Sequence, residues 1–201
     1  MTTEEETRRS IGAKRNPKSA EAIREAAEGL LLEEGYRGFS IEAVARRARA
    51  GKPTIYRWWP SKAALLLDVY HRQKRDVESP DTGSLEEDLL RFLRSLFRNW
   101  RETPAGNVFR SFIAEAQTDD TAAAALADYA RERRIHTARM ISRARERGEV
   151  GAEVDPEVVA DLVASYAWSH LLTGRLDEGD DALRAAIGII VNGAARRPVP
   201  E

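Results

Sequence analysis

Helix signals recur along the chain, and they restrict its fold more than any other feature of the sequence. Apolar residues return three and four positions apart, which is the spacing that places them on one face of an α-helix. Residues that favour helix N-termini precede these segments, most clearly Ser40, Ser84 and Asp155. No segment shows the sustained alternation of apolar and polar residues that indicates a half-buried strand. We therefore predict an all-α protein of about nine helices.

The composition agrees with this prediction and narrows the class of protein. Ala, Leu, Arg and Glu dominate, and all four are strong helix formers. The 201 residues are 42% hydrophobic and 32% charged, which allows a sizeable core and suits amphipathic helices. Cysteine is absent, so disulfides and thiolate zinc sites are excluded. We expect neither a metal nor a cofactor.

Two segments bear on where the protein works. Residues Met1–Arg15 lack the apolar stretch of a signal peptide. The longest Leu-rich run, Ala63–Leu67, is far too short to span a bilayer. We therefore expect a soluble, cytoplasmic protein with no membrane partner.

The charge of the chain is unevenly distributed. Its net charge is −1, but residues 1–75 hold 16 Lys and Arg against 10 Asp and Glu, a balance of +6. Residues 76–201 hold 16 against 23, a balance of −7. A basic front and an acidic back are typical of a protein that presents one face to a polyanion, although chance clustering is the alternative.

The same signals divide the chain into two helical domains between flexible ends. Residues 1–16 are polar and are predicted to form an N-terminal arm. A helix-turn-helix domain is expected over 17–60 and a larger helical domain over 61–194, followed by a flexible tail at 195–201. Gly35 is expected to stop the first helix.

Residues 41–60 carry the strongest functional signal, two short helices joined by about three residues, the size of a helix-turn-helix. The second helix of that motif enters the major groove of DNA, so one face must be apolar and the other must offer donors. Ile55 and Trp59 fit the inner face, and Pro53 adds a rigid apolar contact for a thymine methyl. The donors are Lys52, Thr54, Tyr56 and Arg57.

This stretch resembles the N-terminal domain of the tetracycline-repressor (TetR) family. The likeness covers about residues 18–70 and is carried by Gly35-Tyr36, by Ser40–Ala45 and by Gly51–Lys62, which is Gly-Lys-Pro-Thr-Ile-Tyr-Arg-Trp-Trp-Pro-Ser-Lys. The resemblance implies a dimeric regulator whose first three helices bind DNA and whose later helices form a ligand pocket and a dimer interface. We therefore expect double-stranded operator DNA, a second copy of the chain and a small-molecule effector as partners.

The resemblance also implies roles for single residues. Lys52, Pro53 and Thr54 fall where the family contacts bases, whereas Tyr56 and Lys62 fall where it contacts phosphate. The sequence departs from the family pattern where Trp58 replaces Tyr or His, Arg49 replaces a turn glycine and Gly51 replaces a capping serine. The predicted DNA-binding set is Ser40, Arg49, Lys52, Pro53, Thr54, Tyr56, Arg57, Trp58 and Lys62.

Each of these residues also has a plainer interpretation. The basic ones could be solvated surface charges and the aromatic ones core residues. In the N-terminal arm, Arg8, Arg9, Lys14 and Arg15 could reach a minor groove or belong to a plain tail.

Aromatic residues recur in the helices after residue 76 and could line an apolar pocket, although core packing is the alternative for each. Because few of them are charged, we expect an apolar or aromatic effector. The candidates are Phe97, Trp100, Phe109, Phe112, Glu115, Tyr129, His136, Tyr166, Trp168 and His170.

The last two helices resemble in position the pair that forms a four-helix dimer bundle in this family. Their apolar residues could equally face the core of the chain itself. The interface candidates are Val159, Val163, Tyr166, Ile187, Ile190 and Val191.

The predicted function is that of a repressor that an effector releases from an inverted-repeat operator. The helix at 61–75 would carry the signal, because Trp59-Pro60-Ser61 forms a tight joint to the helix-turn-helix. An adaptor that kept the fold and lost DNA binding is the alternative. An enzyme is least expected, since phosphate-binding loops, dinucleotide motifs and zinc-protease motifs are absent.

Overall fold

The structure is a computed structural model that describes residues 17–74, 77 and 79–194. This part of the chain contains ten helices and no strand, which confirms the all-α prediction. The helices are α1 (Pro17–Glu33), α2 (Gly35–Gly38), α3 (Ile41–Ala48), α4 (Lys52–Trp58), α5 (Lys62–Gln73), α6 (Leu85–Glu102), α7 (Ala105–Glu115), α8 (Asp120–Glu146), α9 (Pro156–Thr173) and α10 (Asp180–Ala194).

The prediction of about nine helices missed the short helix α2. Gly35 adopts a positive φ of 67°, a conformation that suits glycine, and it ends α1 as expected. The chain then makes a single helical turn, Gly35–Gly38, before the extended residue Phe39. A turn of four residues has no apolar periodicity of its own, so the pattern could not reveal it. The predicted arm and tail lie outside the described residues.

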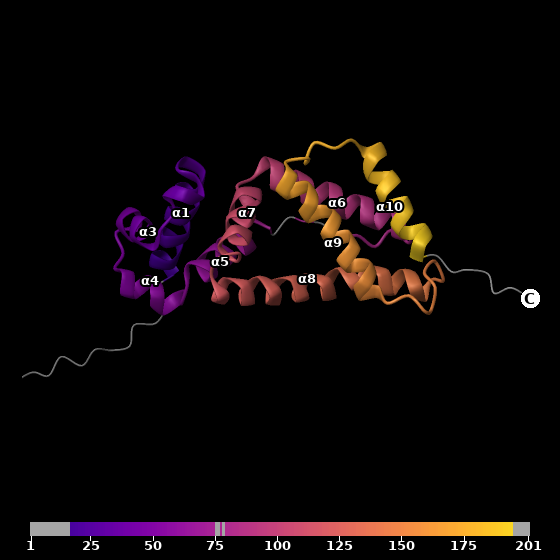
Figure 1. Cartoon of the computed structure of the whole chain (residues 1–201), viewed down its shortest axis with the longest axis horizontal. Coiled ribbons are helices and arrows are strands. Elements are labelled where there is room, and N and C mark those ends of the chain that lie inside the picture. The colour runs from indigo at the N-terminus through magenta and orange to yellow at the C-terminus, as the bar shows by residue number, and fades with distance from the viewer. Residues whose placement is uncertain (1–16, 75–76, 78, 195–201) are drawn as a thin grey trace, which may run out of the picture.

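The molecule is elongated, with the helix-turn-helix at one end (Figure 1). Helix α1 packs against α3, α5 and α7, so the N-terminal helices share a continuous core with the rest of the chain. The long helix α8 runs along one side, and α6, α9 and α10 lie at the other end. Helix α5 therefore lies between the two ends and touches α1, α7 and α8.

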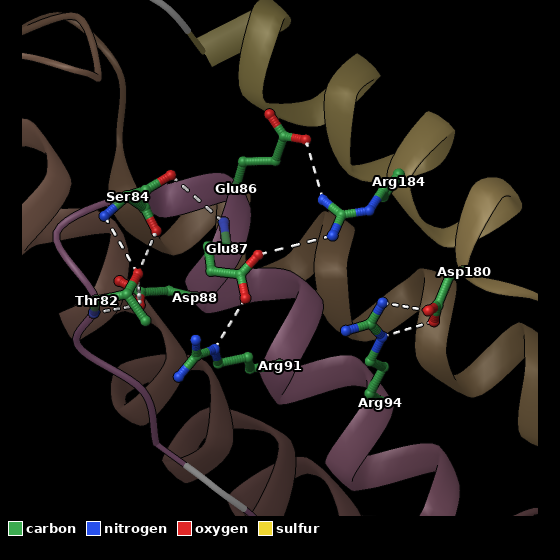
Figure 2. A network of polar contacts seen from close by, with 9 residues as sticks. All are labelled: Thr82, Ser84, Glu86, Glu87, Asp88, Arg91, Arg94, Asp180 and Arg184. Carbon is green, nitrogen blue, oxygen red and sulfur yellow. Dashed lines mark hydrogen bonds and ion pairs between the residues drawn. The ribbon is translucent and has the colours of Figure 1, made fainter.

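Ion pairs join α6 to α10 on the surface (Figure 2). Arg94 donates from Nε to the Asp180 carboxylate at 2.6 Å, and Arg184 lies 3.9 Å from the Glu87 carboxylate. Ser84 caps α6 and accepts the N–H of Glu87 at 3.5 Å, but the Glu87 side chain does not return a hydrogen bond to the N–H of Ser84 as in a capping box. Its carboxylate accepts from Arg91, and the N–H of Ser84 bonds to Thr82 instead.

Candidate functional site

The two helices of the helix-turn-helix are held by local hydrogen bonds. Ser40 caps α3, and its Oγ accepts the N–H of Ala43 at 3.1 Å. Arg49 ends α3 in the left-handed region with φ 51°, and is the one non-glycine residue in the described part of the chain with a positive φ. This conformation normally selects glycine, so Arg49 carries local strain. Its side chain is exposed beside α4.

The inner face of α4 is anchored as the sequence predicted. Ile55 and Trp59 are buried. The indole Nε1 of Trp59 donates to Asp68 Oδ2 at 2.7 Å, and Arg24 Nε donates to the same oxygen at 2.8 Å. Residues of α1 and α5 therefore fix the orientation of the second helix.

The outer face of α4 presents the predicted donors to solvent. Lys52, Pro53, Tyr56 and Arg57 are exposed, with Tyr56 47% accessible, and they lie beside half-buried Thr54. The half-buried ring of Trp58 lies 5.7 Å from the Arg57 guanidinium. This face is therefore accessible for base and phosphate contacts.

An acidic residue competes for one of these donors. Lys52 Nζ lies 3.0 Å from Glu42 Oε1 on α3, and this hydrogen bond raises the pKa of Lys52 and lowers the pKa of Glu42. Both side chains are exposed, so the pair is weak and is easily exchanged for a phosphate.

Arg46 is a surface cation that the sequence analysis did not select. It lines a hollow of about 390 Å³ over the turn, together with Arg49 and Lys52. The hollow thus gathers three cations around the start of α4. Its sequence position could have indicated this, because Arg46 comes four residues after Glu42 and therefore lies on the same face of α3.

Lys62 is the first residue of α5 and is paired with the last residue of α7. Its amine is 3.0 Å from Glu115 Oε2 and 4.0 Å from the centre of the Tyr36 ring. Burial lowers the pKa of Lys62 and raises the pKa of Glu115. Glu115 was predicted to contact a ligand, and Lys62 was predicted to contact phosphate. In the structure these two side chains form an ion pair with each other.

A second site is a cavity of about 80 Å³ between α5, α6, α8 and α9. Four of the predicted ligand residues line it: Trp100, Tyr129, His136 and Trp168. The sequence analysis missed Lys74, Val77, Phe92, Leu96, Arg133, Thr137, Ala164 and Ala167, which also line it.

Polar groups gather at one part of the cavity. Lys74 Nζ donates to Tyr129 Oη at 3.1 Å, and Trp100 Nε1 donates to Tyr70 Oη at 3.0 Å. Burial, and then the nearby Arg133 guanidinium, lower the pKa of Lys74 to about 7. Burial also raises the pKa of Tyr129 well above its usual value.

Six predicted ligand residues lie elsewhere. Phe97, Phe109 and Phe112 are core residues, and the Phe109 ring stacks on Tyr70 with 4.5 Å between centroids. Tyr166 donates to Glu178 at 2.9 Å, and His170 Nε2 contacts the same carboxylate, so both fasten α9 to the segment before α10. The sixth is Glu115, paired with Lys62. Periodicity could not separate the helix faces that meet at the cavity from those that meet in the core.

The predicted dimer residues also need correction. Val159, Val163 and Ile187 are buried inside the chain and cannot face a partner, while Tyr166, Ile190 and Val191 are half-buried. The exposed apolar residues of these helices are Val158, Leu162, Leu172 and Ile189, at 57, 53, 52 and 75% accessibility. On α9, the exposed Val158 and Leu162 each come one residue before the buried Val159 and Val163, which is a rotation of about 100° around the helix.

The part of the chain that the structure describes has neither a metal-binding cluster nor a membrane-spanning helix. No cluster of three or more His, Asp or Glu residues is suited to hold a metal ion. The described helices are each too short or too polar to cross a membrane.

Comparison with known proteins agrees with this architecture. Residues 23–69 match the model of bacterial regulatory proteins of the tetR family, and residues 79–190 match a tetracyclin repressor-like C-terminal domain. The chain is 32% identical to the uncharacterized HTH-type transcriptional regulator YdeS of Bacillus subtilis, over 85% of this chain and 86% of the relative. It is 32% identical to the DNA-binding transcriptional repressor TetR of Mycobacteroides abscessus, over 85% and 88% of the two chains.

A solved structure shows the same fold. The crystal structure of the TetR family transcription regulator SCO0332 superposes with a TM-score of 0.70 at 32% identity, over 88% of this chain and 98% of that one. Together the two domain matches span most of the helical part of the chain. The chain is thus a transcriptional regulator rather than an enzyme, and it belongs to the TetR family.

Proposed function

We propose that the protein is a repressor that binds an inverted-repeat operator as a homodimer and leaves it when a small molecule enters the C-terminal cavity. The observation that carries the DNA part is the exposed outer face of α4, with Lys52, Pro53 and Tyr56 accessible while Ile55 and Trp59 anchor the helix. The name of the Mycobacteroides abscessus relative, a DNA-binding repressor, supports the sign of regulation.

A single recognition helix touches few bases, so the proposal needs two copies related by a two-fold axis. The outward residues of α9 supply a suitable face, because Val158, Leu162, Ser165, Ser169 and Leu172 are exposed and recur at alternating intervals of four and three. On α10, Ala182, Ala185, Ile189 and Asn192 are exposed at intervals of three and four. This spacing is typical of helices that pack side by side, and it supports a four-helix interface.

The test is a mobility-shift titration with the DNA upstream of the protein's own gene, using Lys52→Ala and Tyr56→Phe. We expect Lys52→Ala to cost about 1–3 kcal/mol on the operator if Lys52 contacts a base. Tyr56→Phe removes only a hydroxyl, so it should weaken binding to all sequences about equally.

Arg131→Ala is the matched control, since it removes an exposed cation from α8 instead. Wild-type affinity in both test variants would contradict the proposed DNA contacts. Absence of any shift in the wild type would favour an adaptor that has lost DNA binding.

A further inference from the structure

The polar part of the cavity is built almost entirely from hydrogen-bond donors. Lys74, Arg133, His136, Tyr129 and Thr137 line it, and among the residues that the structure describes no Asp or Glu lines it. Lysine and arginine can only donate, and the hydroxyls and imidazole can donate as well. This part of the described lining therefore offers donors to an acceptor, and the Glu132 carboxylate, which bonds to Arg133, lies outside the lining.

The two cations are incompletely paired. Among the described residues Lys74 has Tyr129 Oη as its hydrogen-bond acceptor and no carboxylate partner. Arg133 gives one terminal nitrogen to Glu132 at 2.8 Å, and its Nε is buried without an acceptor. Buried donors without acceptors are costly, so both side chains are suited to a ligand that brings an anion.

The rest of the lining is apolar, and several of its side chains are planar aromatic rings. Phe92, Leu96, Trp100 and Trp168 supply it, with the small residues Ala164 and Ala167. Aromatic and branched side chains of this kind favour a planar apolar body. The cavity therefore has an apolar side and a cationic side.

We propose that the effector is a small aromatic carboxylic acid, whose ring lies against Trp100 and Trp168 and whose carboxylate bonds to Lys74 and Arg133. This inference rests on the proposed function and replaces the expectation of an effector with few charged contacts. The cavity of about 80 Å³ is smaller than the cavity of roughly 150 Å³ that accommodates benzene, so a ring must displace the surrounding helices to enter.

A carboxylate beside Lys74 also predicts a pH dependence. In the empty cavity burial lowers the pKa of Lys74 to about 7, so the amine is largely neutral at pH 8. A bound carboxylate favours the charged amine, so binding takes up a proton and weakens as the pH rises above 7. Among the residues that the structure describes, the other titratable or charged groups around this amine are Tyr70, His71, Tyr129, Glu132, Arg133 and His136.

The test is calorimetric titration of the full-length protein with benzoate and indole-3-acetate, each against its neutral amide. We expect the acids to bind at least about tenfold more tightly at pH 7, and Lys74→Met and Arg133→Met each to abolish that preference. At pH 8, titrations in two buffers of different ionisation enthalpy should show proton uptake in the wild type and none in Lys74→Met. Arg139→Met is the control, because Arg139 is exposed on the same helix and does not line the cavity.

The outcomes separate this inference from the proposed function. Equal affinity for acid and amide, or no binding of either acid up to millimolar concentration, overturns the inference even if the protein binds its operator. Acids that bind with the expected preference but leave operator affinity unchanged support the ligand class and contradict the proposed regulation. Circular dichroism of each variant excludes misfolding, and Lys74→Gln provides a second substitution.

Discussion

Arg49 of the helix-turn-helix has a backbone conformation that is unfavourable for a residue other than glycine. A non-glycine residue in the left-handed region costs about 1–2 kcal/mol, and the family pattern has glycine at this position. The side chain lies exposed beside Arg46 and Lys52 over the turn. A cation retained at a strained position is suited to phosphate contact.

We therefore expect Arg49→Gly to stabilise the protein and weaken its DNA binding. Relief of strain should raise the free energy of unfolding by about 0.5–1 kcal/mol, after allowance for the flexibility of glycine in the unfolded chain. Loss of one phosphate contact should lower the slope of log affinity against log salt by about 0.9. Thermal denaturation and salt-dependent anisotropy titrations measure the two effects.

Arg49→Ala is the control for this experiment, since it removes the charge but keeps the strain. It should reduce the salt slope by the same amount without the gain in stability. An unchanged slope in both variants would show that Arg49 has no contact with phosphate.

At the scale of elements, the caps and the helix-turn-helix were predictable from sequence because they depend on neighbouring residues. Ser40, Ser61 and Asp155 each accept the N–H that their cap predicts. The outward face of α9 was not predictable, since Val158 and Val159, like Leu162 and Val163, are adjacent apolar pairs. Such a helix has apolar residues on both faces, and only the packing of the neighbouring helices, chiefly α8, decides which face is buried.

The cavity could not be predicted from local sequence patterns, because its lining residues are far apart in the sequence. Lys74 directly follows α5 and Arg133 lies in the middle of α8, and nothing in the local pattern around either residue indicates that both line one cavity. The same holds for Lys62 and Glu115, which are far apart in the sequence and join α5 to α7. The Lys62 amine also lies 4.0 Å from the centre of the Tyr36 ring, so the ion pair lies where α2 meets these two helices.

We expect Glu115→Gln to raise operator affinity a few-fold. Burial opposes the charged form of both partners, as the directions of their pKa shifts show, so the pair stabilises the fold little. Without the carboxylate, the Lys62 amine is free to reach a phosphate, and the salt slope should rise. The free energy of unfolding should change by less than about 1 kcal/mol.

Lys62→Met is the complementary variant, and it should lower both affinity and slope. If Lys62 serves only to fasten α5 to α7, both variants will instead lower the melting temperature and leave the salt slope as in the wild type. Anisotropy and calorimetry together distinguish the two roles.

At the scale of the whole molecule, Figure 1 shows α4 near one end and α6 and α9, which help to line the cavity, toward the other, with α5 between them. Lys74 follows the last residue of α5, and Lys62 is its first. A ring that displaces Lys74 and its neighbours therefore moves the helix to which the helix-turn-helix is attached. Only a dimer converts such a movement into altered DNA binding, because the spacing of two recognition helices must match two half-sites.

The proposed regulation therefore requires a dimer. We expect dimerisation to depend on the exposed residues of α9 and α10 that form the proposed four-helix interface. We expect Leu162→Glu combined with Ile189→Glu to give a folded monomer, because both side chains are more than half exposed and neither supports the core. Operator affinity should fall at least about a hundredfold with the loss of the second half-site. Light scattering after size exclusion measures the mass.

Ile135→Glu, at a site 47% exposed on α8, is the matched control and should remain dimeric. A double variant with unchanged dimer mass would exclude this face of α9 and α10 as the interface and would show that the dimer forms through another surface.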